Sequence, residues 1–191
     1  MVKNILRSFL LLMIFTIILG FLYPLLITGI SKIVFLYRSS GSLIKYDNKV
    51  VGSELIGQNF TGEQYFHSRP SAATKDDYYP LSSGGSNYAS TNKDFISAVK
   101  ERISNFRKEN NLEDYIKIPS DIVTSSGSGL DPDISVDNAL LQADRIAKKR
   151  NIPVSEVNDL IRQNIEKRML GFLGEPKVNV LKLNLLLDNL Y

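Results

Sequence analysis

The chain of 191 residues contains no cysteine and a single histidine, which excludes disulfides, thiol catalysis and zinc sites built on cysteine. Its formal net charge is +3, but two basic residues, Lys3 and Arg7, lie close to the N-terminus. The remaining 21 basic and 20 acidic side chains nearly cancel. A chain with this balance is not expected to bind nucleic acid.

Residues 8–30 carry no charged side chain, and 15 of these 23 residues are Leu, Ile or Phe. As a helix rising about 1.5 Å per residue, the stretch spans roughly 34 Å, enough to cross a hydrocarbon core of about 30 Å. A cleaved signal peptide would have a shorter apolar core of about 7–15 residues and a cleavage site of small residues. No alanine precedes Ala72. We therefore predict a retained transmembrane anchor.

The predicted organisation has three parts: a short cytoplasmic segment (1–7), the transmembrane helix and its exit (8–36), and a single extracytoplasmic α/β (α+β) domain (37–191). Basic residues flank the anchor on both sides, so the positive-inside bias is slight. We favour an N-terminus in the cytoplasm and a C-terminal domain outside. The predicted location is the plasma membrane, with the anchor in contact with lipid.

Small residues recur every four positions within the anchor, at Thr16, Gly20, Pro24 and Thr28. Small side chains on one face allow another helix to approach closely in lipid. Pro24 also has no amide hydrogen to donate to the carbonyl of Gly20, which predicts a kink or a partner there. We therefore expect a packing face for another membrane helix.

The domain is predicted to mix strands, long loops and helices. In chain order we expect strands and turns at 49–60, a long loop at 61–92, a helix capped by Thr91 and running to about 110, and a strand at 115–118. Two further helices follow, one from its cap at Ser135 to 150 and one from Pro153 to about 169. Alternating leucines at 179–190 fit either a strand or a helix, and we favour a helix.

No enzyme motif is complete. The glycine spacing of a phosphate-binding loop is followed by Gln58, where lysine is required. A calcium loop that would open at Asp131 has Gln142 in its twelfth position, where glutamate is required. Two Ser-x-x-Lys pairs lack their companion motifs, and the sequence identifies neither a nucleophile nor an orienting partner for His67 as a general base. We therefore predict no catalytic residue and no metal site.

The segment 124–132 is the most distinctive polar stretch, rich in serine and glycine. Its backbone amides and hydroxyls could cradle an anion or line a polar pocket. Equally, it could be a tight connector whose glycines adopt positive φ. Gln142 and Arg145 share a face of the next helix and could bind the oxygens of a ligand or an acidic group of a partner.

Further motifs run in order along nearly the whole chain. They are Tyr23-Pro24, Thr28-Gly29, Gly41-Ser42-Leu43-Ile44, Gly57-Gln58-x-Phe60, Tyr65-Phe66, Arg69-Pro70-Ser71-Ala72, Ser83-Gly84-Gly85-Ser86-Asn87, Ser128-Gly129-Leu130-Asp131-Pro132, Gln142-x-x-Arg145, Leu170-Gly171-Phe172-Leu173-Gly174-Glu175-Pro176 and Val178-Asn179-Val180-Leu181-x-Leu183-Asn184. In these motifs the chain resembles the KdpC family, the C subunit of the Kdp potassium-transporting ATPase. It departs from the family pattern at Leu36, at 88–90 and at Asp133.

The resemblance implies a non-catalytic accessory subunit of the complex that transports potassium. Its implied partners are a channel-like potassium-translocating subunit, a P-type ATPase subunit and a small membrane subunit. The family is also described as a catalytic chaperone that raises the affinity of the ATPase subunit for ATP, which makes ATP an implied ligand. The implied ligand or subunit contacts are Ser83, Gly84, Gly85, Ser86, Asn87, Ser126, Gly127, Ser128, Gly129, Asp131, Gln142 and Arg145.

ATP is cytoplasmic, so the nucleotide role conflicts with the predicted topology. The simpler hypothesis is that the domain clamps the outer face of the potassium-translocating subunit. Two alternatives remain: an anchored serine hydrolase that uses Ser125, Ser126 or Ser128, and an anchored ligand-binding module.

Overall fold

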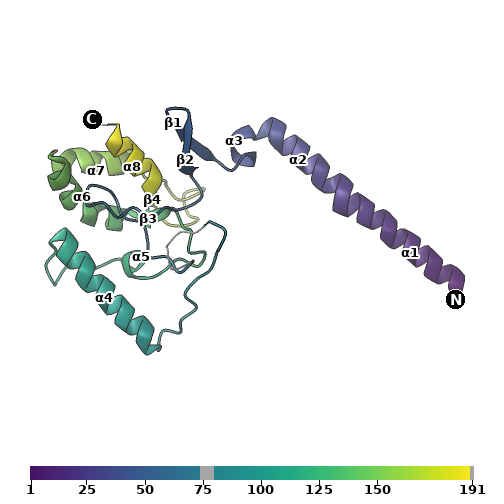
Figure 1. Cartoon of the computed structure of the whole chain (residues 1–191), viewed down its shortest axis with the longest axis horizontal. Helices are drawn as coiled ribbons and strands as arrows, with labels where there is room; N and C mark the ends of the chain where they lie inside the picture. The colour runs from purple at the N-terminus through teal and green to yellow at the C-terminus, as the bar shows by residue number, and fades with distance from the viewer. Residues whose placement is uncertain (74–79, 190–191) are drawn as a thin grey trace. The chain divides into compact units, whose positions relative to one another are not determined.

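The computed structural model describes residues 1–73 and 80–189 (Figure 1). The chain divides into two compact units, Met1–Val51 and Gly52–Tyr191. The first unit contains the apolar helix and the second contains the mixed domain, so the fold class predicted from the sequence is confirmed.

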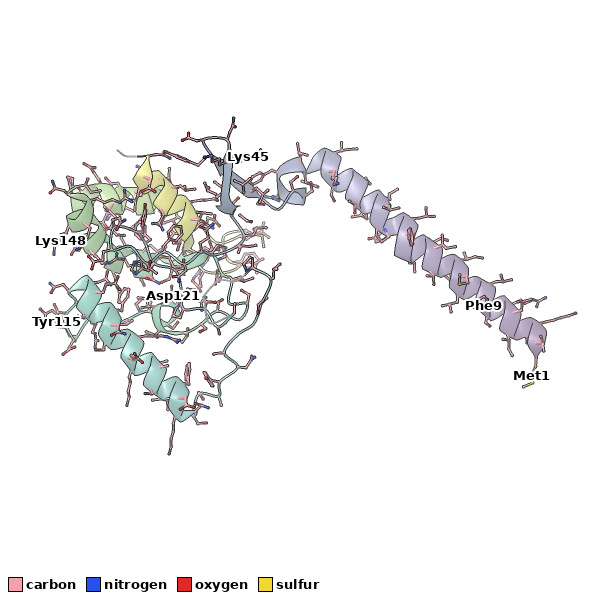
Figure 2. The ribbon with its side chains drawn as sticks, in the orientation of Figure 1. Met1, Phe9, Lys45, Tyr115, Asp121 and Lys148 are labelled. Atoms are coloured by element: carbon pink, nitrogen blue, oxygen red, sulfur yellow. The ribbon has the colours of Figure 1, made fainter. Side chains whose placement is uncertain are left out.

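The first unit begins with one continuous helical run, Val2–Val34, which is long and apolar enough to cross a membrane. It consists of α1 (Val2–Ile17), a π-helical turn η1 (Ile18–Leu22) and α2 (Tyr23–Val34). None of its apolar side chains is buried within the chain, and Figure 2 shows them projecting all around the helix. A short helix α3 (Leu36–Ser39) follows, and then two paired strands, β1 (Leu43–Tyr46) and β2 (Lys49–Ser53).

The π-helical turn lies directly before Pro24, where the sequence predicts an irregularity. Because proline has no amide hydrogen, the regular ladder of hydrogen bonds cannot continue through it. The amide of Tyr23 instead donates to the carbonyl of Ile18, five residues earlier. The helix therefore meets the proline by widening one turn, which is the usual form of a π-bulge.

The core of the second unit lies among α6 (Val136–Arg150), α7 (Val154–Gln163), α8 (Val180–Asp188) and two short strands, β3 (Asp133–Ser135) and β4 (Lys177–Asn179). The strands are antiparallel, with Ile134 opposite Val178. Most of the buried apolar side chains form one cluster, made of Phe66, Ile134, Ala139, Ala143, Ile146, Ala147, Val157, Ile161, Val178, Val180, Leu183 and Leu187. Among the described residues of the long loop, Phe66 alone belongs to this cluster.

Two further helices, α4 (Lys93–Asn110) and α5 (Ser120–Val123), pack beside α6 and β3 (Figure 1). The cap of α4 is Asn92 and not Thr91, since the Asn92 side chain accepts from the amides of Asp94 and Phe95. The predicted cap at Ser135 is confirmed, because its hydroxyl accepts from the amide of Asn138.

The predicted strand at 115–118 is wrong. The chain turns there, and the guanidinium of Arg107 donates hydrogen bonds to the carbonyls of Asp114 and Ile116. In a sheet these carbonyls would instead accept from a neighbouring strand. The helix predicted to reach 169 ends at Gln163, because Glu166 pairs its backbone with Lys177 instead. The helix favoured for 179–190 is confirmed as α8 over its described residues.

Candidate functional site

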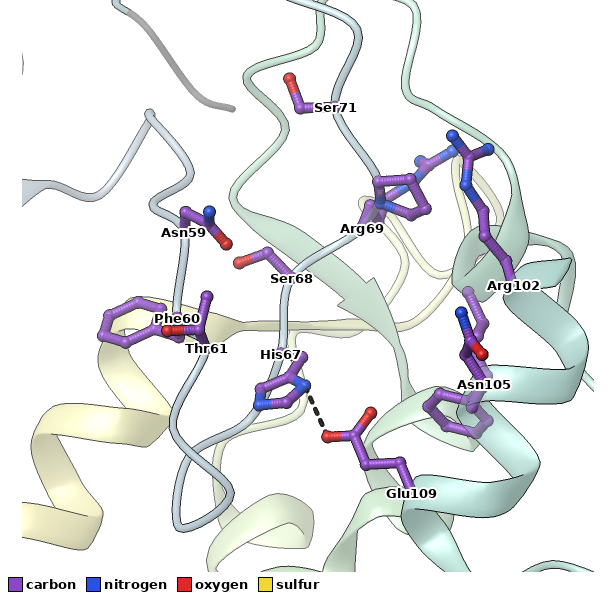
Figure 3. Close-up of a pocket in the computed structure, with 13 residues that line it drawn as sticks. Asn59, Phe60, Thr61, His67, Ser68, Arg69, Ser71, Arg102, Asn105 and Glu109 are labelled. Atoms are coloured by element: carbon purple, nitrogen blue, oxygen red, sulfur yellow. Dashed lines mark ion pairs between the residues drawn. The ribbon is translucent and has the colours of Figure 1, made fainter. Parts of the chain in front are cut away.

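A pocket of about 520 Å³ lies between α4 and the first part of the long loop (Figure 3). Arg102, Asn105, Phe106 and Glu109 line one side from a single face of α4, because residues three and four apart are neighbours on a helix. The other lining residues are Asn59, Phe60, Thr61, His67, Ser68, Arg69, Pro70, Ser71 and Ile122. The pocket is therefore formed where the loop passes over a helix.

His67 connects the two sides of this pocket. Its Nδ1 lies 3.0 Å from Oε1 of Glu109, and its Nε2 lies 3.0 Å from the carbonyl oxygen of Gly62. Both partners are acceptors, and an imidazole offers a hydrogen at both nitrogens only when it is protonated. The hydrogen bond from His67 lowers the pKa of Glu109 below its ordinary value, against the opposing effect of burial. The pair thus joins the loop to α4 across the pocket.

The backbone of His67 is held by the side chain of Gln142. The Gln142 Oε1 accepts from the amide of His67 at 2.7 Å, and Nε2 donates to the His67 carbonyl at 3.3 Å. Nε2 also donates to Asn138 at 2.8 Å. One side-chain amide thereby satisfies the two backbone groups of a loop residue, much as a neighbouring strand would do.

Arg145, one turn further along α6, holds the same loop. Its Nη1 donates to the carbonyls of Tyr65, at 3.0 Å, and Glu63. Nη2 donates to Gln142 at 2.8 Å and Nε donates to Asn110 at 3.0 Å. Burial lowers the pKa of Arg145, and the nearby carboxylates of Glu109 and Glu63 oppose this effect. The guanidinium is fully engaged inside the domain.

Gln142 and Arg145 are among the predicted ligand or subunit contacts, and the structure places both in the interior. Only 1% of Gln142 and 5% of Arg145 is exposed. Their polar atoms bind the segment 63–67 and its neighbours, so in this structure they position the loop. A direct contact with a ligand does not fit these two side chains as they lie.

The two predicted Ser/Gly segments are brought together. The amide of Gly84 and the hydroxyl of Ser83 donate to the carbonyl of Ser128, at 2.8 and 3.1 Å. Gly129 has φ +69°, and a Cβ there would lie 2.7 Å from the carbonyl oxygen of Gly84. Glycine is therefore required where the segments cross, and Gly85 similarly lies close to Gly127. The carbonyl of Ser128 thus joins the two segments.

The same contact region extends to residues 69–71. The Nη1 of Arg69 lies 2.8 Å from Oδ2 of Asp131, and the hydroxyl of Ser71 donates to the carbonyl of Gly129 at 2.7 Å. Of the other predicted residues, Ser126 is buried, whereas Ser86 is half-buried and Asn87 is exposed with φ +53°. Asp131 thus anchors the loop beside the pocket through Arg69.

The lining residues of the pocket were not in the predicted set. The sequence signal that points to them is the polar face of α4, on which Arg102, Asn105 and Glu109 lie three to seven residues apart. Within the described ranges, 1–73 and 80–189, no group of three or more His, Asp or Glu side chains is arranged to hold a metal ion.

One apolar helix of membrane-spanning length, followed by one small mixed domain, indicates a single-pass membrane protein. Comparison with known families gives the more specific assignment. Residues 5–189 match the model of the KdpC family, described as the c chain of the K⁺-transporting ATPase. The chain belongs to this family and is thus a subunit of the Kdp potassium-transporting ATPase.

Curated relatives agree in name and in length. The potassium-transporting ATPase KdpC subunit of Mycobacterium tuberculosis (strain H37Rv) is 49% identical over 188 residues, which cover 98% of this chain and 99% of the relative. The subunit of the same name from Photorhabdus laumondii is 52% identical over 186 residues, covering 97% and 96%. That from Caldanaerobacter subterraneus is 51% identical over 173 residues, covering 91% and 88%.

Proposed function

We propose that this chain is a non-catalytic accessory subunit of the Kdp complex, which supports assembly by clamping the outer face of the potassium-translocating subunit. The observation that carries the proposal is the full-length match to the c chain family. The specific partners proposed are the potassium-translocating subunit, the P-type ATPase subunit and the small membrane subunit of that complex.

The geometry of the pocket supports the non-catalytic part of the proposal. General base catalysis needs a base within hydrogen-bond reach of a nucleophile. Here both ring nitrogens of His67 face the acceptors Gly62 and Glu109. The hydroxyl of Ser68 donates to the carbonyl of Gln58 at 2.8 Å. These groups are occupied in holding the loop in place. This favours a domain that acts by binding partner subunits through its surface.

The anchor contributes to assembly through its predicted packing face. Along the helical run, the structure leaves four residues of this face exposed, Thr16, Gly20, Pro24 and Thr28. The hydroxyl of Thr16 donates to the carbonyl of Leu12 at 2.8 Å, so it presents mainly its methyl group outward. We propose that this stripe packs against a helix of a neighbouring subunit, with the N-terminus in the cytoplasm and the domain outside.

The test is to purify the complex after deletion of residues 40–191, leaving the anchor in place. Loss of the accessory domain should lower the yield of intact complex and its potassium transport. A chain with a reporter for compartment fused after Tyr191 serves as the companion measurement and should report the extracytoplasmic side. Unchanged assembly and transport after the deletion would contradict the clamp, and a cytoplasmic reporter would contradict the topology.

A nucleotide role, which the family resemblance implies, is the finer part of the proposal and needs its own measurement. The KM for ATP of the complete complex should be lower than that of a complex lacking this chain. The burial of Gln142 and Arg145 argues that such an effect would be transmitted through subunit contacts and not by these side chains touching ATP. Equal KM values in the two complexes would contradict the chaperone role.

The two alternatives remain testable on the chain by itself. A serine hydrolase would lose a soluble activity when Ser125, Ser126 or Ser128 is replaced by alanine. An independent binding module would bind a small ligand saturably without partner subunits. The accessory-subunit proposal expects neither result.

A further inference from the structure

Residues 166–177 form a short hairpin, which we call the 166–177 arm. Glu166 and Lys177 exchange two backbone hydrogen bonds at its base, of 2.8 and 3.2 Å. Met169 and Leu173 exchange two more near its tip, of 2.9 and 3.0 Å. The arm continues directly into β4, whose Lys177 also lies opposite Ser135 of β3. It is therefore fixed to the sheet and is not a loose loop.

The tip of the arm is apolar and exposed. The exposed fractions are 68% for Met169, 79% for Leu170, 70% for Phe172 and 44% for Leu173. Gly171 completes the turn with φ +84°, and Leu170 itself has φ +54°. A branched aliphatic residue rarely adopts the left-handed region, so the hairpin bonds hold the tip in this form. Contiguous apolar groups held out of the core mark an interaction site.

The charges around the arm indicate what kind of surface covers the tip. Arg168 pairs with Glu175 at 2.5 Å, and Lys177 pairs with Asp133 and lies 3.9 Å from Glu166. A segment that inserts into an anionic membrane surface carries lysine and arginine on its polar side, and interfacial anchors use Trp and Tyr. Here two of the three cations of the arm, Arg168 and Lys177, are paired with carboxylates, and the aromatic ring at the tip is that of a phenylalanine. This charge balance favours an uncharged apolar groove on a protein.

We propose that the tip of the 166–177 arm docks into an apolar groove on another protein subunit of the same potassium-transporting ATPase. The inference rests on the proposed function, since it takes the partner from the complex. Phe172 and Leu170 are the expected anchors, because large apolar side chains in a desolvated pocket dominate binding. The hairpin bonds give the tip its shape before binding, so little further ordering is needed on docking.

The first experiment places a photo-crosslinking phenylalanine analogue at position 172 in the chain within the whole complex. The control places the same analogue at Tyr115, an aromatic residue that is 81% exposed at a site far from the arm in sequence. Position 172 should crosslink to another protein subunit and position 115 should not. Crosslinking of position 172 only to lipid, only to a second copy of this chain, or to nothing in an intact complex would overturn the proposal.

The second experiment tests the energetic importance of the tip. The double variant Leu170→Ser with Phe172→Ser should weaken association with the remaining subunits at least tenfold. Its matched control is Leu81→Ser with Tyr115→Ser, which removes one leucine and one aromatic residue of equal or greater exposure. Since all four side chains are exposed, the isolated chains should unfold alike. Equal retention of both variants in the complex would overturn the proposal.

Failure of this inference can be told apart from failure of the proposed function. If the unmodified chain does not copurify with the ATPase subunits, the accessory role itself fails. If it copurifies and the arm variants behave like their controls, only the docking of the arm fails.

Discussion

The helical core around α6, α7 and α8 and the loop layer at 57–73 and 82–87 are held in different ways. The core is a cluster of fully buried aliphatic side chains on three helices and two strands. The loop layer contributes Phe66 to that cluster and is otherwise held by polar groups, among them Arg145, Gln142 and Asp131. Most of these bonds run from a side chain to a backbone group.

The difference teaches which forces place irregular backbone on a domain. A helix satisfies its own amides and carbonyls, and so apolar burial is enough to dock it. An irregular loop leaves these groups open, and the domain must supply partners when it covers them. Gln142 and Arg145 supply four such partners within residues 63–67. Removing one of these polar partners should therefore lower the free energy of unfolding about as much as truncating a buried side chain of the core.

The largest expected effect is that of Arg145→Met, which leaves the buried carbonyls of Tyr65 and Glu63 without the guanidinium that donates to them. Loss of one partner from a buried charged network costs about 3–5 kcal/mol. Urea unfolding of the full chain in detergent measures this loss. Arg162→Met is the control, since that side chain is 70% exposed and its change should stay within about 0.5 kcal/mol. Equal effects of the two variants would contradict the role given to Arg145.

Leu183→Ala tests the core side of the comparison. Leu183 is fully buried in the apolar cluster, and such a truncation costs about 2–5 kcal/mol through lost burial and the cavity left behind. The same unfolding measurement should show a much smaller loss for Leu186→Ala on the exposed side of α8. A Leu183 variant as stable as the Leu186 variant would contradict the assignment of the core.

Gly129→Ala tests the crossing of the two Ser/Gly segments. The added Cβ would meet the Gly84 carbonyl at 2.7 Å in a left-handed backbone, for an expected cost of about 1–3 kcal/mol. Gly127→Ala is the matched control, because a Cβ there has nothing within 4 Å and φ is not positive. The comparison is read from the two unfolding midpoints, and a tolerated Gly129 variant would show that the segments separate easily.

Asn92→Ala should cost about 1 kcal/mol, since it removes the side-chain acceptor for two amides at the start of α4. Thr91→Ala, at the position where the sequence places the cap, should change the unfolding free energy by a few tenths of that amount. Thermal unfolding of both variants is sufficient. The reverse order of the two effects would support the cap expected from the sequence.

The smallest expected effect is a pH dependence that belongs to Glu109. Its pKa is lowered in the folded chain, chiefly by the bond from His67, so its contribution to stability is present above the ordinary value of 4.5. That contribution is lost as the pH falls below 4.5 and through the lowered pKa. Urea midpoints measured across the acidic range should therefore fall less steeply for Glu109→Gln. Glu101→Gln, an exposed change on the same helix, should keep the slope of the unmodified chain.

The helices and the anchor could be predicted because their signals are local. The uncharged stretch 8–30, the cap at Ser135 and the 3.6-residue spacing of apolar residues in α6 each depend on neighbours in the sequence. Ends were less predictable where distant residues decide them. The helix α7 stops at Gln163 because of Lys177, and the turn at 115–118 depends on the guanidinium of Arg107.

The candidate site could be predicted only in part, for the same reason. The Ser/Gly segments stand out by composition, but their pairing joins Ser83 to Ser128, 45 residues away. Gln142 and Arg145 stand out as a polar pair, yet the sequence cannot tell that they face inward. Their partners lie 75 to 82 residues earlier in the chain. The 166–177 arm is the reverse case. Its motif is easily found in the sequence, but only the structure shows that its apolar residues are exposed.

The separation between Arg145 and its partners also bears on the order of folding. The segment 63–67 leaves the ribosome well before α6, and bonds that span some 80 residues form late because the intervening chain must close first. We expect α6, α7, β3, β4 and α8, all within the last 60 residues, to associate before the loop settles on them. During synthesis Phe66 therefore stays unburied until the helices that pack against it have been made. A chain that ends before Arg145 would leave this segment accessible to chaperones and proteases.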